Sequence, residues 1–284
     1  MVTVSTLANA WSGHIGKQDT NRLLLLDAIQ GRTVLNRSAN DTQTDKRMAM
    51  TVRVGASGFS YKEWLGNFYP SRLAGSKMLA YYAERLPTVE INYTFRAMPR
   101  RAMLERWAEQ APAHFRFALK APQRITHFAR LRNAEDTTGF FAETAGALGE
   151  RLGPALFQLP PDFERDVPRL RDFLAMLGGR MRAAFEFRHR SWFNDHSALQ
   201  TLADHGAALC IAESDRMASP AERTAPFIYV RLRKETYDDG ELATWAMRLK
   251  QLGAGADELY VFFKHETGAP ALAARLRAML GDAG

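Results

Sequence analysis

Five short apolar segments of this sequence each carry a polar or charged residue at or near their C-terminal end. These residues are Glu90, Lys120, Gln158, Glu186 and Arg231. Alternate side chains of a strand point to opposite faces, so Glu186 is expected to lie opposite Phe185 and Phe187. Lys and Glu are rarely fully buried without a partner. We therefore expect these side chains either to bind a ligand or to form an internal ion-pair network that stabilises the protein.

The carboxylates and two histidines suit proton transfer. Glu90 or Glu186 could act as general base or acid, and His127 or His189 could be a second proton carrier. In a strand that ends at Glu186, the carboxylate has no direction but inward. An inward carboxylate needs a cation to stay charged, so Glu186 is expected within ion-pair reach of Lys120 or an arginine.

Three cations among the same segments suit anion binding. Arg188 and Arg231 could hold an oxyanion through two parallel hydrogen bonds, and Lys120 could act as a point charge. Nearby carboxylates are expected to keep Lys120 charged, which disfavours its use in a Schiff base. Further candidate substrate contacts are Asn92, Tyr61, Trp64, Gln158 and Trp192. Trp64 and Trp192 are expected to line a pocket wall.

Eight apolar runs of four to six residues could position these groups as buried strands. They cover residues 52–56, 88–92, 115–120, 155–159, 183–187, 207–212, 227–232 and 259–263. Helical patterns are expected between them over 77–86, 99–110, 140–152, 170–177, 191–205, 241–252 and 270–280, with Ser76 as a helix cap. Only residues 213–226 lack a clear helix.

Strands that alternate with helices indicate parallel pairing with right-handed crossovers. Eight such units predict a single α/β domain, a (β/α)₈ TIM-type barrel over residues 50–284. An open doubly wound sheet is the alternative, but no glycine-rich phosphate loop follows the first strand. In a barrel, strand ends and the loops after them form the C-terminal face, where active sites lie.

The first 49 residues differ in composition from the rest. They contain one aromatic residue, Trp11, and no Pro, and residues 31–47 are polar without periodicity. We expect this extension to be poorly structured or to precede the true start at Met50. It resembles no secretory signal, and no segment is apolar enough to span a membrane, so a cytoplasmic protein is expected. The single cysteine, Cys210, lies in an apolar run and is expected to be buried.

The net charge of +7 favours anionic partners. Basic residues are interleaved with acidic ones, as in Arg101, Glu105, Arg106 and Glu109, and no run of five like charges occurs. This interleaving disfavours nucleic acid as a partner. A small anionic molecule is the expected ligand.

Several ordered motifs resemble the YecE-like family, also called domain of unknown function 72. They are residues 54–64 (VGASGFSYKEW), 68–70 (FYP), 88–92 (TVEIN), 117–122 (FALKAP), 125–127 (ITH), 152–154 (LGP), 157–161 (FQLPP), 184–189 (AFEFRH) and 191–192 (SW). The resemblance covers residues 52–280 and implies a TIM-type barrel without implying an activity. Many relatives carry His-Gly after the arginine at Arg231 and an Asn-rich run after the last strand. Here Leu232-Arg233-Lys234 and Lys264-His265-Glu266 add charge at both places.

Together these features favour an enzyme that acts on a phosphorylated or carboxylated small molecule. A divalent-metal hydrolase or isomerase is one alternative, with ligands drawn from Glu90, Glu186, His189, Asp215 and His265. A glycosidase is disfavoured, because carboxylates on the second and fifth strands are expected to be too far apart. A barrel that binds a ligand or nucleic acid without catalysis is the non-enzymatic alternative. The sequence does not specify substrate, reaction, cofactor or oligomeric state.

Overall fold

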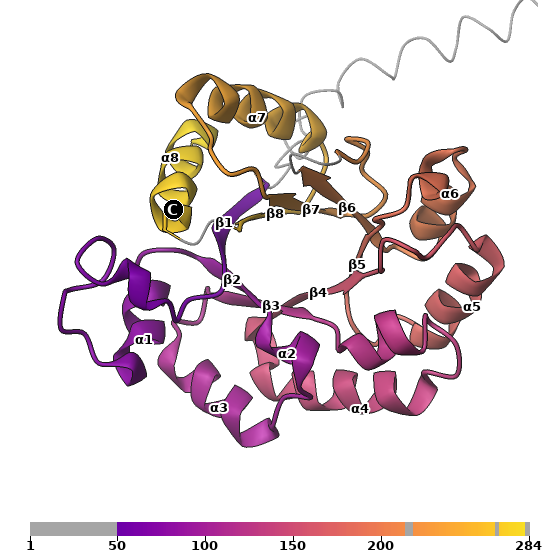
Figure 1. The fold of residues 1–284 in the computed structure, drawn as a ribbon, viewed down its shortest axis with the longest axis horizontal. Coiled ribbons are helices and arrows are strands. Elements are labelled where there is room, and N and C mark those ends of the chain that lie inside the picture. The colour runs from indigo at the N-terminus through magenta and orange to yellow at the C-terminus, as the bar shows by residue number, and fades with distance from the viewer. Residues whose placement is uncertain (1–49, 214–217, 265–266, 282–284) are drawn as a thin grey trace, which may run out of the picture. The chain divides into compact units, whose positions relative to one another are not determined.

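The computed structural model describes residues 50–213, 218–264 and 267–281. Eight parallel strands close into a barrel in chain order, and helices surround it (Figure 1). The (β/α)₈ barrel predicted from the sequence is confirmed. The strands are β1 (Thr51–Ser57), β2 (Thr88–Ile91), β3 (Arg116–Lys120), β4 (Leu152–Gln158), β5 (Ala183–Glu186), β6 (Ala208–Glu213), β7 (Phe227–Leu232) and β8 (Glu258–Phe263).

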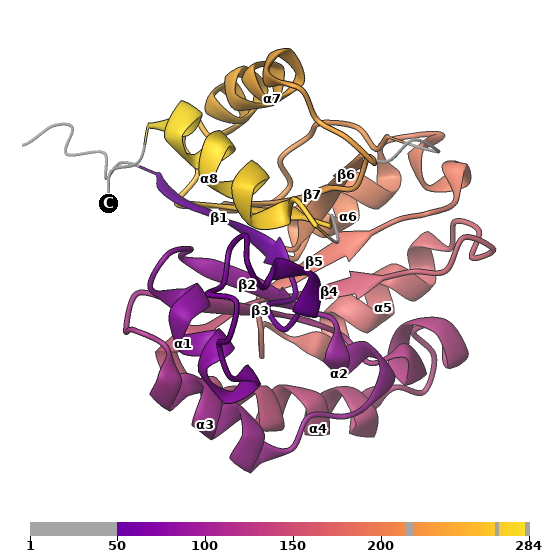
Figure 2. The same cartoon turned by 60° about the vertical axis from the view of Figure 1, so that its left-hand side comes forward.

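Helices follow the strands and pack against the outside of the barrel (Figure 2). They are α1 (Met78–Ala83), α2 (Tyr93–Arg96), α3 (Arg101–Gln110), α4 (Glu135–Ala145), α5 (Val167–Leu177), α6 (Ser197–Asp204), α7 (Asp239–Leu252) and α8 (Ala269–Leu280). Short 3₁₀- or π-helical segments are η1 (Lys62–Trp64), η2 (Gly75–Lys77), η3 (Arg124–Phe128), η4 (Gly146–Arg151, kinked at Gly149) and η5 (Arg190–Phe193). None of the helices in the described ranges is long and apolar enough to cross a membrane.

Some predicted helix boundaries are wrong. The helix expected over 140–152 begins earlier, at Glu135, with two acidic residues in its first turn, and Leu152 already belongs to β4. Ser76 is not a cap, because it lies inside η2 and α1 begins without a side-chain cap. The predicted lack of a helix after β6 holds for residues 218–226. The extension over residues 1–49 lies outside the described residues.

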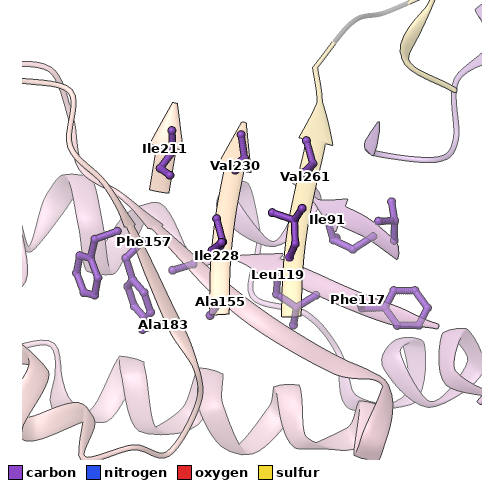
Figure 3. Packing of buried hydrophobic residues seen from close by; sticks show 14 of the residues in the cluster. Ile91, Phe117, Leu119, Ala155, Phe157, Ala183, Ile211, Ile228, Val230 and Val261 are labelled. Carbon is purple, nitrogen blue, oxygen red and sulfur yellow. The ribbon is translucent and has the colours of Figure 1, made fainter. Parts of the chain in front are cut away.

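Strand alternation creates two separate cores. On β7, Ile228 and Val230 face outward and pack between the strands and the helices (Figure 3). Phe227 and Tyr229 face into the barrel, where they form a second apolar cluster that includes Cys210. Cys210 is buried, as predicted. Arg231 continues the inward face of β7, so the charged groups at the mouth of the barrel lie next to the apolar cluster inside it.

The N-terminal end of the barrel is closed by a different charged cluster. Glu258, at the start of β8, accepts a hydrogen bond from Arg53 Nε at 2.9 Å and another from Arg182. The Arg182 guanidinium also lies over the Phe227 ring and donates to Tyr260 Oη at 2.9 Å. Burial raises the pKa of Glu258, but the hydrogen bonds and charges of Arg182 and Arg53 together outweigh it and the pKa is lowered. This cluster is internally paired, which indicates a structural role.

Replacing Glu258 with glutamine should lower the free energy of unfolding by about 1–3 kcal/mol, because two partly buried arginines lose their shared anion. Denaturant unfolding followed by circular dichroism measures the change. The matched control is Glu105→Gln, which breaks only an exposed pair with Arg101 on α3. An equal loss in the free energy of unfolding for both variants would contradict a structural role for Glu258.

Candidate functional site

All five inward polar residues identified from the sequence belong to one chain of hydrogen bonds. Lys120 Nζ donates to Gln158 Oε1 at 2.8 Å, and Gln158 Nε2 donates to Glu186 Oε2 at 2.8 Å. Arg231 Nη1 donates to the same Glu186 oxygen, and Arg231 Nη2 donates to Glu90 Oε1 at 2.8 Å. This series of hydrogen bonds runs across the C-terminal mouth of the barrel. It starts on β3, passes through β4, β5 and β7, and ends on β2. Inward alternation on short strands accounts for this convergence.

Glu90 is fully buried and both of its oxygens are occupied. Besides Arg231, Ser57 donates to Oε1 at 2.7 Å and Tyr229 donates to Oε2 at 2.8 Å. Burial alone would raise the pKa of Glu90, but Arg231 and the hydrogen bonds from Ser57 and Tyr229 outweigh it, so the pKa is lowered. Glu90 is therefore held as a carboxylate.

Glu186 points inward, as strand alternation predicts, and has three arginine neighbours. Arg231 is the closest; Arg233 Nη1 lies 3.3 Å and Arg188 Nε lies 3.7 Å from Glu186 Oε1. Burial raises its pKa, but Arg231 and Arg233 outweigh burial and lower the pKa to about 2. The same two carboxylates raise the pKa of Arg231 despite its burial. Glu90, Arg231 and Glu186 thus form a fully charged buried triad.

Lys120 lies at the edge of this triad and lacks a carboxylate partner. Within the described residues, no carboxylate oxygen lies within 4.0 Å of Nζ, which instead lies 3.8 Å from the centre of the Phe95 ring. Burial and the positive charge of Arg231 lower the pKa of Lys120 to about 8. Glu90 and Glu186 favour the charged amine, as expected, so Lys120 is still mostly charged at pH 7, but burial and Arg231 outweigh them and leave the pKa below its usual value.

The two candidate histidines differ in their surroundings. His127, on η3, packs edge-on against Phe95 and its Nδ1 lies 2.9 Å from Thr126 Oγ1. Burial lowers the pKa of His127, and Lys120 and Arg188 lower it further. His189 Nδ1 accepts a hydrogen bond from the backbone of Ser191 at 3.3 Å and so caps η5. His127 therefore lies near Lys120, whereas His189 Nδ1 is already occupied by its hydrogen bond with Ser191.

The remaining predicted substrate contacts separate into two places. Arg188 follows β5 at the mouth, and its side chain is 36% exposed. Tyr61 and Asn92 instead line a mainly apolar groove of about 340 Å³ with Trp107. The groove lies at the C-terminal ends of β1 and β2, since Gly58 and Asn92 directly follow these strands. Its lining suits an apolar part of a ligand.

Trp64 and Trp192 do not line a pocket, so that expectation is wrong. Trp64 is fully buried and packs against the rings of Tyr82 and Phe68. Trp192 is also fully buried; it stacks on Phe187 with ring centres 4.3 Å apart. Both indoles fill the layer between strands and helices, because the loops that carry them fold back onto the outside of the barrel.

The metal and glycosidase alternatives fare differently. Within the described ranges, no three His, Cys, Asp or Glu side chains are grouped to hold a metal ion, and Asp215 and His265 lie outside those ranges.

The wide separation of Glu90 and Glu186 that was expected to disfavour a glycosidase is wrong. One guanidinium bridges them, because a long side chain from β7 reaches across to both β2 and β5.

Two contributors to the network escaped the sequence-based site prediction. Ser57, at the end of β1, and Tyr229, on β7, both donate to Glu90. Arg233, whose charge was expected after Arg231, contacts Glu186. The signal for Tyr229 was available, because it precedes Arg231 by two residues and so shares its face. Arg233 follows Arg231 by the same spacing.

The fold and this network define a closed parallel barrel whose charged groups gather at the C-terminal ends of its strands. The chain belongs to the family described as protein of unknown function DUF72, whose model matches residues 53–284. This confirms the resemblance noted in the sequence. The family description carries no activity, so the function must be argued from the residues.

Two curated relatives share part of the chain. The UPF0759 protein YecE of Escherichia coli K12 is 34% identical over 152 residues, which is 53% of each protein. The UPF0759 protein YunF of Bacillus subtilis 168 is 30% identical over 161 residues, covering 54% of this chain and 56% of that protein. The matched segments therefore span about half the length of these relatives.

Solved structures share the fold over a longer stretch. A DUF72 family protein from Thermotoga maritima MSB8 has a TM-score of 0.71 at 25% identity, covering 82% of this chain and 100% of that one. A DUF72 family protein from Enterococcus faecalis V583 has a TM-score of 0.69 at 21% identity, covering 82% and 97%. Both likenesses support a common barrel architecture.

Proposed function

We propose that the C-terminal mouth of this barrel binds a small anionic substrate and that the protein is an enzyme acting on a phosphorylated or carboxylated molecule. The observation that carries the proposal is an excess of positive charge. Four cations, Lys120, Arg188, Arg231 and Arg233, surround two carboxylates, Glu90 and Glu186. Arg231 alone bridges both carboxylates, so the other three cations are left with partial compensation at most.

The electrostatics of the mouth support this assignment. Burial and Arg231 lower the pKa of Arg233, and like charges also lower the pKa of Lys120 and of His127. Buried cations that depress each other's pKa values are stabilised when an anion enters. Two buried donors, Arg231 Nε and Arg233 Nε, have no hydrogen-bond partner within the part of the chain that the structure describes. An oxyanion would supply acceptors for such donors.

The residues divide by role in this proposal. Arg188 and Arg233 bind the anion from the exposed side, with Lys120 as a point charge behind them. His127 carries a proton at the rim. Glu90 and Glu186 hold Arg231 in place rather than transferring protons, because both carboxylates are buried and charged. We assign His189, Tyr61 and Asn92 only to secondary contacts with the substrate around this centre.

Inorganic phosphate should stabilise the protein by mass action. At ten times its Kd, phosphate is expected to raise the free energy of unfolding by about 1.4 kcal/mol, which shifts Tm by a few degrees. Thermal unfolding at constant ionic strength measures the shift. The Arg188→Gln variant should lose most of it, because Arg188 faces the mouth.

The matched control for the phosphate experiment is Arg190→Gln. Arg190 lies two residues further along, is exposed, and makes no contact with Glu186. It should respond to phosphate as the wild type does. A wild type that shows no shift, or an Arg188→Gln variant that keeps the full shift, would contradict anion binding at the mouth.

Turnover separates an enzyme from a barrel that only binds its ligand. Phosphorylated and carboxylated compounds that stabilise the protein are incubated with it, and products are followed by mass spectrometry. Consumption of such a compound by the wild type but not by Lys120→Gln supports catalysis. Binding without consumption of any stabilising compound favours the non-enzymatic alternative.

A further inference from the structure

Lys120 differs from the other three cations of the mouth in its contacts. Arg188, Arg231 and Arg233 each approach Glu186 within 4.0 Å. The Lys120 ammonium instead contacts a neutral amide oxygen, Gln158 Oε1, and the face of the Phe95 ring. Neither partner can take up a proton or supply a full negative charge. The amine is thus held by groups that position it without fixing its charge.

The backbone and surroundings of Lys120 are also rigid. Lys120 is the last residue of β3, and Thr94 Oγ1 donates to its carbonyl oxygen at 2.7 Å. The residue is only 8% exposed, so the amine meets little water. The Phe95 ring contacts both the amine and His127, whose ring centre is 4.9 Å from that of Phe95. A buried, oriented amine next to a neutral histidine is an arrangement suited to nucleophilic attack.

We propose that Lys120 is a nucleophile that condenses with the carbonyl group of an anionic substrate to form an imine. This inference rests on the proposed function, since the same mouth would hold the anionic group. The substrate class is therefore a small carbonyl compound that also carries a carboxylate or a phosphate. Arg188 and Arg233 would bind that anionic group while the carbonyl carbon faces Nζ.

The condensation balances without any further reactant. The lone pair of neutral Nζ forms a bond to the carbonyl carbon, and the carbonyl oxygen takes up a proton. The resulting carbinolamine loses its oxygen as water, and the C=N double bond forms with a proton retained on nitrogen. Neutral His127 is suited to take up the proton that the Lys120 ammonium loses and then to donate it to the oxygen that leaves as water. Because the pKa of Lys120 is about 8, roughly a tenth of the amine is neutral at pH 7.

Borohydride trapping tests the imine directly. The full-length protein is incubated with pyruvate in one arm and dihydroxyacetone phosphate in another, and each mixture is reduced with sodium borohydride. Intact mass should increase by the mass of the probe less one oxygen, and peptide mapping should place the adduct on Lys120. The yield should rise with pH around pH 8, as the amine loses its proton. The arm that gives more adduct identifies carboxylate or phosphate as the preferred anion.

Two variants separate Lys120 from the other lysines. Lys120→Arg keeps the positive charge but has no nucleophilic amine, so the adduct should fall at least tenfold while circular dichroism shows a folded protein. Lys250→Arg, on the exposed side of α7, should be trapped like the wild type. Adduct spread evenly over the surface lysines, or full trapping of Lys120→Arg, would overturn the proposal.

Anion binding at the mouth and imine formation at Lys120 can be tested separately. Phosphate stabilisation without any Lys120 adduct from either probe would overturn the imine while leaving anion binding supported. Equal trapping of acetone, which has no anionic group, would support a reactive Lys120 amine but contradict the anion-binding role of the mouth. Inorganic phosphate should compete with both anionic probes and reduce the adduct.

Discussion

Replacing Arg231 with methionine should destabilise the protein by about 3–5 kcal/mol at neutral pH. The guanidinium bridges Glu90 and Glu186, and all three side chains are at most 2% exposed. Methionine can fill part of the space but leaves Glu90 buried without an ion-pair partner among the described residues, and it leaves Glu186 with Arg233 and Arg188 only. Removing one partner of a buried ion pair costs more than the pair itself contributes, because the remaining charge is stranded in an apolar setting. Denaturant unfolding at pH 7 measures the loss.

The dependence of stability on pH should also change sign in Arg231→Met. In the wild type, the pKa of Glu186 is about 2, below its usual 4.5. Its contribution to stability is complete above pH 4.5 and is lost as the pH falls toward 2. In the variant, burial without a cation raises the pKa of Glu90 above its unfolded value. The variant should therefore become more stable as the pH falls from 7 toward 5.

The control for this pair of measurements is Arg275→Met. Arg275 forms an exposed pair with Asp239 between α8 and α7, and such a pair contributes less than about 1 kcal/mol. It should show the wild-type pH dependence. A cost below about 1 kcal/mol for Arg231→Met, or a loss of stability on acidification, would show that the triad is hydrated rather than a buried structural unit.

The strands and the inward polar residues could be predicted because both depend on local periodicity. Short Val, Ile and Phe-rich runs identified β1 to β8, and alternation placed Glu90, Lys120 and Glu186 on the inner face. The bridge through Arg231 could not be predicted this way. It depends on how far one side chain reaches across the closed barrel, and sequence spacing contains no information on that distance.

The misassigned aromatics and the helix α4 show a different limit. An indole in a loop after a strand can point either toward the mouth or back onto the barrel wall, and Trp64 and Trp192 take the second course. For α4, the apolar spacing was read as starting at Phe140, which proves to be 55% exposed. Glu135 and Asp136, in the first turn, carried the better signal for its start, since acidic residues favour helix N-termini.

Replacing Trp192 with alanine should cost about 3–5 kcal/mol, because a fully buried aromatic side chain is removed from a packed layer. Its ring lies nearly parallel to Phe187, with 4° between the planes, and edge-on to Phe163. The indole Nε1 also donates to the Phe163 carbonyl oxygen at 2.7 Å. Trp192 therefore anchors the loop after β5 through both packing and a buried hydrogen bond.

The Trp192→Phe variant separates those two contributions. Phenylalanine keeps most of the stacking on Phe187 but leaves the Phe163 carbonyl without its donor, at a cost of about 1–3 kcal/mol. Phe128→Ala is the control, since Phe128 is 71% exposed and its removal should change stability by no more than about 0.5 kcal/mol. Denaturant unfolding of the three variants gives the order of their free energies of unfolding.

The same loop carries Arg188 to the mouth, so its anchoring affects the site as well as stability. Loosening it in Trp192→Phe should also reduce the stabilisation by phosphate, because Arg188 would no longer be held beside Glu186. A tryptophan that lined a ligand pocket would give the reverse pattern. Truncation to alanine would then leave the free energy of unfolding within about 0.5 kcal/mol of the wild type and would change only ligand binding. That result would restore the pocket-wall role of Trp192.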